Sequence, residues 1–119
     1  MHLAHLDDKG GNAVKMRWFG QNTNLHSVWD SKILENKGFS YTEYANYLYD
    51  VYGKQRKEIL RMTEAETLLY TYHLTDSVYQ YQSTWSGNAY HYTYRWTEAV
   101  EYQMYLAGVQ LAEMLNKIF

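Results

Sequence analysis

The stretch Asn24–Asp30, with the sequence Asn-Leu-His-Ser-Val-Trp-Asp, is the segment from which the fold of this chain is best worked out. Asn22 or Thr23 can cap a helix here and Gly38 can end it, so a helix is predicted over about residues 25–35. His26 and Asp30 are four residues apart, so a helix places both side chains on one face. An imidazole and a carboxylate in this arrangement can occupy adjacent positions around one zinc ion. A surface ion pair is the commoner meaning of the same spacing.

The segment before this helix predicts a turn followed by a short strand. Residues 7–12, Asp-Asp-Lys-Gly-Gly-Asn, are typical of a turn, because Gly permits positive φ and because Asp and Asn bond their own backbone. Residues 13–19 alternate apolar and polar side chains, which indicates a half-buried strand that ends at Gly20. If this unit folds back, His2 can supply a third ligand. Two histidines and one carboxylate form a common catalytic zinc set, with water in the open position.

The remainder of the chain has the spacing of amphipathic helices. Ser40 and Glu43 form a capping box, which predicts a helix from residue 41 to residue 53. A further helix is expected from Thr63 to about residue 79, and a last one from residue 92 or 97 to the end. The tyrosines at positions 90, 92 and 94 alternate as in a strand and leave the start of the last helix open. The fold class expected is mainly α, with one small β element.

Composition limits the classes of function. At 119 residues, 46% of them hydrophobic, the chain has the size and the apolar content of one packed domain, expected over residues 1–119. The 14 tyrosines are more typical of helix packing than of stacking on nucleobases. With a net charge of −2, the overall field does not attract a polyanion, so a nucleic-acid contact would have to come from a local site such as a metal. No stretch is long and apolar enough for a membrane span.

Several other groups of side chains have a simpler structural meaning. The basic residues of the stretch 54–61 could meet phosphates, but a solvated helix start is the plainer interpretation. His5 is expected to be a solvated loop residue, and His73 and His91 are expected to be packing or surface residues. The remaining carboxylates are expected to be caps or solvated helix charges. The absence of cysteine excludes disulfides and a thiolate zinc site within this sequence.

Residues 8–31 resemble one block of the S1/P1 nuclease family, the fungal, plant and bacterial zinc nucleases that share a fold with bacterial phospholipase C. The block comprises Asp-Lys-Gly-Gly-Asn at residues 8–12, Val-Lys-Met-Arg-Trp-Phe-Gly at 14–20 and Thr-Asn-Leu-His-Ser-Val-Trp-Asp-Ser at 23–31. Met1 and His2 match the end of the family's preceding segment, and residues 105–116 resemble its closing helix. The resemblance implies the C-terminal portion of the phospholipase C/nuclease helical fold, with one short β-hairpin near the N-terminus.

The same resemblance implies a function for four residues. His2, His26 and Asp30 would bind one zinc ion of a three-zinc cluster. Asn12 would lie beside the cluster as a catalytic residue that orients a phosphate. Zinc ions polarise a phosphoryl oxygen and generate hydroxide near neutral pH, which suits the hydrolysis of phosphodiester bonds. The implied activity is endonucleolytic cleavage of single-stranded DNA or RNA by a secreted or periplasmic protein.

The family's other zinc ligands have no counterpart in these 119 residues. We therefore expect this chain to be the C-terminal part of the nuclease domain, with one zinc site that has most of its ligands and no activity of its own. Helices without their neighbours leave apolar surface uncovered, so we expect pairing with the missing N-terminal part or a homo-oligomer. Two alternatives stay open. One is a phospholipase C-like phosphodiesterase, which typically has Glu where Asp30 stands, and the other is a non-catalytic helical module that binds no metal.

Overall fold

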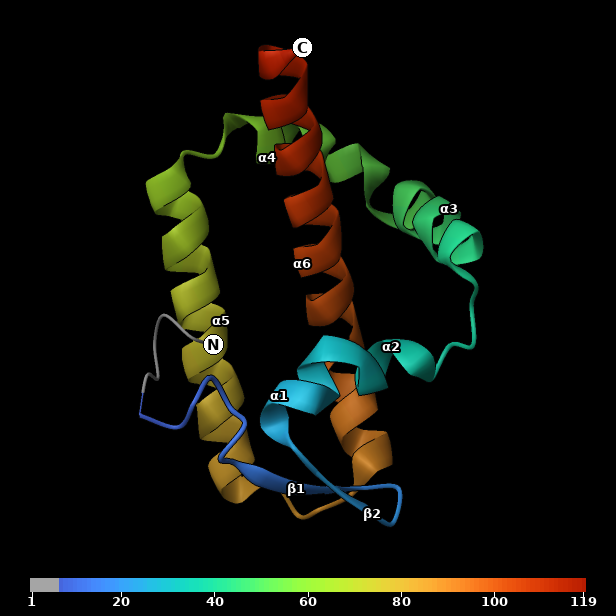
Figure 1. Cartoon of the computed structure of the whole chain (residues 1–119), viewed down its shortest axis with the longest axis vertical. Coiled ribbons are helices and arrows are strands. Elements are labelled where there is room, and N and C mark those ends of the chain that lie inside the picture. The colour runs from blue at the N-terminus through green and yellow to red at the C-terminus, as the bar shows by residue number, and fades with distance from the viewer. Residues whose placement is uncertain (1–6) are drawn as a thin grey trace.

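The computed structural model describes residues 7–119 and consists of a long helical pair with smaller elements packed along it (Figure 1). α5 (Glu64–Thr84) and α6 (Ala89–Ile118) run antiparallel. Gln110 Nε2 donates to Thr67 Oγ1 across this pair at 2.7 Å. Figure 1 shows a β-hairpin beside the lower end of the pair and shorter helices beside its upper end. No helix within the described range is long and apolar enough to cross a membrane.

The predicted hairpin is confirmed. β1 (Lys15–Trp18) pairs antiparallel with β2 (Gln21–Asn24). The two residues between the strands, Phe19 and Gly20, have φ angles of 48° and 82°. Positive φ at both positions is what the tightest hairpin turns require, since it matches the twist of the strands. Buried and exposed side chains alternate along β1, which explains the alternation in the sequence.

The predicted helix over residues 25–35 forms as one helical run in three parts. α1 (Leu25–Ser27) follows Asn24, whose Oδ1 accepts from the backbone nitrogen of residue 27 at 2.9 Å. Asn24 therefore caps the helix, and the predicted caps, Asn22 and Thr23, lie in β2 instead. The middle part, η1 (Val28–Lys32), is π-helical, and α2 (Ile33–Glu35) completes the run. Single π-helical turns inside α-helices are rare and are frequent at functional sites. This π-helical turn contains Asp30, one of the two candidate ligands on the helical run.

The next helices follow the predicted order. α3 (Tyr41–Tyr52) has the predicted capping box, because Glu43 N donates to Ser40 Oγ at 3.2 Å and Ser40 N donates to Glu43 Oε1 at 3.1 Å. A 3-10 turn, η2 (Gly53–Gln55), leads into α4 (Arg56–Arg61), and the basic side chains of the stretch 54–61 are exposed. α5 extends to residue 84, beyond the predicted end.

The last helix starts earlier than the sequence pattern indicated. Asn88 caps α6 by accepting from His91 N at 3.2 Å, so the helix begins at Ala89 rather than at residue 92 or 97. Tyr92 is buried, whereas the tyrosines at positions 90 and 94 are exposed. Tyr92 forms a buried stripe with residues 96 and 100, which is helical spacing. The strand-like alternation of the three tyrosines was therefore misleading.

The main hydrophobic core joins the hairpin and the π-helical run to α5 and α6. Its buried members are Met16, Trp18, Leu25, Val28, Ile33, Val78, Ala89, Tyr92, Trp96 and Val100. Trp29 packs against this core, since its Nε1 donates to the hydroxyl of Tyr92 at 2.8 Å and its ring lies 5.6 Å from that of Trp96. Aromatic pairs of this kind stabilise beyond their buried area. The core therefore fixes the helical run on which His26 and Asp30 lie.

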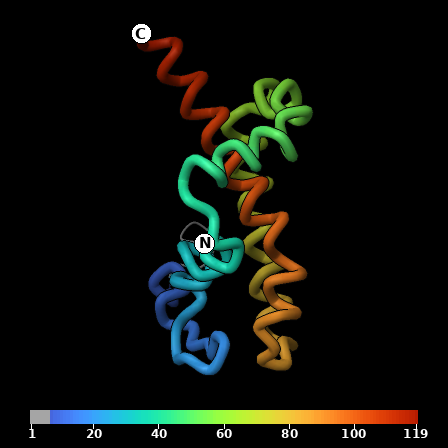
Figure 2. The backbone as a smooth tube through the Cα atoms, turned by 90° about the vertical axis from the view of Figure 1, so that its right-hand side faces the viewer, coloured from blue at the N-terminus to red at the C-terminus, as the bar shows by residue number. Residues whose placement is uncertain are grey.

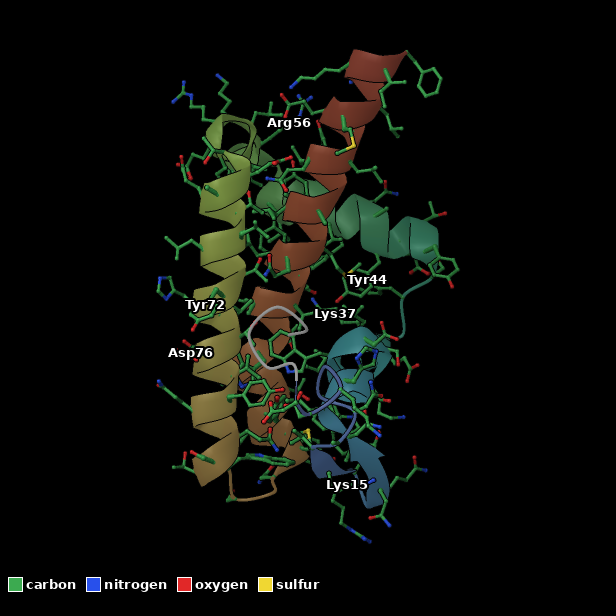
Figure 3. The ribbon with its side chains drawn as sticks, turned by 60° about the vertical axis from the view of Figure 1, so that its left-hand side comes forward. Lys15, Lys37, Tyr44, Arg56, Tyr72 and Asp76 are labelled. Carbon is green, nitrogen blue, oxygen red and sulfur yellow. The ribbon has the colours of Figure 1, made fainter. Side chains whose placement is uncertain are left out.

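A buried carboxylate joins α3 to α6 near the middle of the molecule. Glu101 is 1% exposed, and its oxygens accept from the hydroxyls of Tyr44 at 2.6 Å and Tyr52 at 3.0 Å. Lys37 Nζ lies 3.0 Å from the same carboxylate, and Figure 3 shows Lys37 and Tyr44 beside each other. The expectation that the remaining carboxylates are caps or solvated was wrong for Glu101. The tyrosine partners lie 57 and 49 positions away, so no local pattern reveals them.

Candidate metal centre

The turn before β1 packs directly against the start of α1. Lys9, Gly10 and Gly11 have φ angles of 60°, 67° and 92°, a left-handed run that glycine adopts without strain. A Cβ on Gly11 would lie 3.1 Å from the backbone nitrogen of His26, so this approach also needs a residue without a side chain. His26 N donates to Gly11 O at 3.2 Å. The turn and the helix that carries His26 therefore form one unit.

A backbone carbonyl holds the imidazole of His26. Its Nδ1 lies 3.2 Å from Gly10 O. Because a carbonyl only accepts, this contact is a hydrogen bond when Nδ1 carries the proton, and the neutral ring then has its electron pair on Nε2. Histidine ligands of metals commonly donate their second ring nitrogen to a carbonyl in this way. Nε2 is thus the nitrogen with the electron pair that a metal needs.

Asp30 and His26 line the same cavity, which has a volume of about 270 Å³. His26 is half-buried. Asp30, which lies in η1, is exposed. Gly10, whose carbonyl meets the imidazole, also lines this space. The arrangement agrees with the sequence argument that a spacing of four places both side chains on one face. A nitrogen donor and a carboxylate therefore line the same cavity, which is open to solvent on the side of Asp30.

Polar side chains of the long helical pair line another part of this cavity. Thr71 and Thr75 come from α5 and Gln103 comes from α6. Gln103 Nε2 donates to Thr71 Oγ1 at 3.3 Å, and Thr75 Oγ1 donates to the carbonyl of Thr71 at 2.9 Å. These residues were not predicted, because helices distant in the sequence bring them to the cavity. Their one local signal is the helical spacing of the two threonines, which is common in helices that bind nothing.

Of the two other predicted site residues, His2 and Asn12, only Asn12 lies within the described residues. His2 lies outside the described residues. Asn12 is exposed, and its Nδ2 donates to Lys9 O at 2.8 Å, which closes the turn. Asn12 follows Gly11 directly in sequence but is not among the residues that line the cavity. Its role toward a phosphate therefore stays a prediction.

The donors present fit part of a zinc site. Zinc in proteins is usually tetrahedral, and neutral imidazole nitrogens and carboxylate oxygens are among its common ligands. His26 and Asp30 supply one donor of each kind to the same cavity. Between residues 7 and 119, no three His, Cys, Asp or Glu side chains come together in a group that could hold a metal. The described residues therefore offer this cavity two donors whose chemistry suits zinc.

Comparison with known proteins bears on the family of the chain. The whole chain, residues 1–119, matches the family described as S1/P1 Nuclease. Among curated proteins of Arabidopsis thaliana, Endonuclease 4 and Endonuclease 3 are each 47% identical over 36 residues, and Endonuclease 2 is 43% identical over 35 residues. These stretches cover 30%, 30% and 29% of this chain, and 12% of the length of each relative. No solved structure matches the chain.

Proposed function

Because this chain belongs to the S1/P1 nuclease family, we propose that it is the C-terminal part of a zinc-dependent endonuclease. The proposed reaction is hydrolysis of phosphodiester bonds in single-stranded DNA or RNA. The observation that carries the proposal is the pair of His26 and Asp30, which line one cavity while Gly10 O holds the imidazole. The endonuclease names of the similar proteins support a nucleic-acid substrate.

Three side chains of this chain would hold one zinc ion, namely those of His2, His26 and Asp30. Bound zinc supplies a polarised phosphoryl oxygen and a source of hydroxide near neutral pH. The contact between Gly10 O and Nδ1 would keep the imidazole of His26 directed at the ion. Asn12 Nδ2 has a second hydrogen to donate beyond its bond to the turn, and we assign that hydrogen to a phosphate oxygen of the substrate.

We further propose that residues outside these 119 complete the active site. A catalytic zinc ion needs three protein ligands and an open position, and a cluster of three zinc ions needs far more donors than this chain provides. The chain alone is then inactive and associates with the missing N-terminal part or with a second copy. Exposed apolar side chains near the end of α6 support association, and they are Leu111, Met114, Leu115 and Ile118. The whole protein would be secreted or periplasmic, on the ground of family resemblance alone.

Zinc titration of the 119-residue chain tests the metal site. After removal of metal with a chelator, the chain should bind zinc, and His26→Ala should weaken this binding by more than about 100-fold, because even the outer partners of metal ligands contribute 10–100-fold. His73→Ala is the matched control, since this histidine is exposed on α5 and should leave the affinity unchanged. A native chain that binds no zinc would overturn the proposed site.

A chimera tests the reaction. In it, this chain replaces the matching part of Arabidopsis Endonuclease 4, and cleavage of single-stranded and duplex DNA is measured with and without zinc. We expect zinc-dependent cleavage of the single strand, and its loss on His26→Ala or Asp30→Ala. A folded chimera that cuts neither substrate would contradict the nuclease assignment. Cleavage by the 119-residue chain alone at the rate of the chimera would contradict the incomplete site.

A further inference from the structure

We infer that Tyr79 and Asp8 are positioning residues that fix His26 in the orientation a zinc ion requires. The inference rests on the proposed function, because it treats His26 as a zinc ligand. Neither Tyr79 nor Asp8 lines the cavity, and neither belongs to the proposed ligand set. Both act through the turn that precedes β1.

The first link joins α5 to the turn. The hydroxyl of Tyr79 donates to Oδ2 of Asp8, a residue 71 positions earlier in the chain. The other oxygen of this carboxylate, Oδ1, accepts from Gly11 N at 3.0 Å. Hydrogen bonds to an ionised carboxylate are stronger than those between neutral groups. One carboxylate thus fastens the turn to a long helix that the main core already holds in place.

The second link joins the turn to His26. Gly10 O lies 3.2 Å from the imidazole Nδ1, and Gly11 O accepts from the backbone nitrogen of His26, also at 3.2 Å. Without an anchor, two consecutive glycines can adopt many conformations. The bonds of Asp8 to Gly11 N and to the Tyr79 hydroxyl restrict them to the conformation in which Gly10 O faces the ring. Outer partners of metal ligands typically change metal affinity 10–100-fold.

The protonation of Tyr79 suits this role. Burial of the ring raises the pKa of Tyr79, and the hydrogen bond to Asp8 raises it further. The phenol therefore keeps its proton well above neutral pH and remains a donor to the carboxylate. Replacing it by phenylalanine removes the donor without changing the charge of the folded chain at neutral pH. The effect of that replacement on zinc binding can thus be attributed to the lost link.

Tyr79→Phe in the 119-residue chain is the test, because it removes the hydroxyl and keeps the ring. We expect zinc affinity to fall about 10-fold. In the metal-free variant, the ring nitrogen signals of His26 in NMR spectra should move toward a mixture of the two tautomers. Tyr72→Phe is the matched control, because this tyrosine is on the same helix and is 47% exposed, and it should change neither quantity.

The possible outcomes separate the two proposals. If His26→Ala leaves zinc binding unchanged, the proposed function fails. If His26→Ala abolishes binding but Tyr79→Phe binds zinc like the native chain, only the positioning role is wrong. A lowered melting temperature of the metal-free Tyr79→Phe variant, with native zinc affinity and native imidazole signals, would also overturn the positioning role. Asp8→Asn is the second variant if Tyr79→Phe does not fold, and the same loss of affinity is expected from it.

Discussion

The two ends of the molecule are held together by different means. At the hairpin end, residues 7–35 pack on α5 and α6 through the main core of ten buried residues. At the α3–α4 end, α3 packs on α6 through a cluster of three buried residues, Tyr44, Leu48 and Tyr52, and α4 buries Ile59. The buried Glu101 and its polar partners also join α3 to α6. Figure 2 shows the last part of α6 projecting beyond the other helices, and its apolar side chains are exposed.

This difference shows where the molecule can support a precise site. A metal centre needs side chains held to within about 0.5 Å by elements that do not move, so dense apolar packing around the supporting helix is an advantage. His26 and Asp30 lie on the helical run that the main core fixes. The α3–α4 end instead presents exposed apolar and basic side chains, with Arg56 at the opposite end of the molecule from Lys15 (Figure 3).

Trp96→Ala should have the largest effect on stability, and it should destabilise the hairpin end. Trp96 is 1% exposed and meets several aromatic rings of the main core, among them those of Trp29 and Tyr81. Its removal leaves a cavity and should lower the free energy of unfolding by about 3–5 kcal/mol. Urea denaturation followed by circular dichroism measures this loss, and hydrogen exchange should show that the hairpin amides lose protection first.

The control for this substitution is Tyr94→Ala. Tyr94 lies two positions away on the same helix and is 91% exposed, so its removal should change stability by less than about 0.5 kcal/mol. Equal loss of protection in the amides of α4 and of the hairpin would show that the two ends are packed as one unit, contrary to the comparison above.

Glu101→Gln should have a smaller effect on stability, and it should destabilise the packing of α3 on α6. Both tyrosine hydroxyls donate to the carboxylate, whereas an amide offers a single acceptor oxygen, and the pairing with Lys37 is lost as well. Hydrogen bonds to charged groups contribute about 1.5–3 kcal/mol, so we expect a loss of about 2 kcal/mol. Glu98→Gln is the control, because that side chain is exposed on the same helix. If protection falls in the hairpin and not in α3, the carboxylate does not hold α3 to α6.

The sequence predicted those parts of the structure whose causes are local. The first strand of the hairpin, the helical run over residues 25–35 and the capping box of Ser40 and Glu43 each follow from residues that lie within a few positions of one another, whereas the hairpin itself was implied by the family resemblance. The shared face of His26 and Asp30 follows from helical spacing alone. These predictions needed no knowledge of how distant segments pack.

The features that were missed depend on distant contacts. Glu101 looks like a solvated helix charge until Tyr44 and Lys37 are placed beside it. Thr71 and Gln103 line the cavity because α5 and α6 pack against the helical run, and neither has a neighbour in sequence that indicates a site. The π-helical turn η1 was also not predicted, because a capping residue and a terminating glycine indicate where a helix lies and not its hydrogen-bond pattern.

A pair of glycines, one at each end, should show effects of opposite sign. Gly11→Ala places a Cβ 3.1 Å from His26 N at a φ of +92°, so it should cost about 1–3 kcal/mol and weaken zinc binding. Gly53 has a φ of −56° and open space around a Cβ, so Gly53→Ala should raise stability by about 0.4–1 kcal/mol through the unfolded state. Thermal unfolding and zinc titration of both variants measure these changes. Gly11 lies in close contact with His26, whereas Gly53 has open space around it, so the two changes in stability should have opposite signs. If Gly11→Ala keeps native stability and native zinc affinity, the turn does not need its close contact with His26.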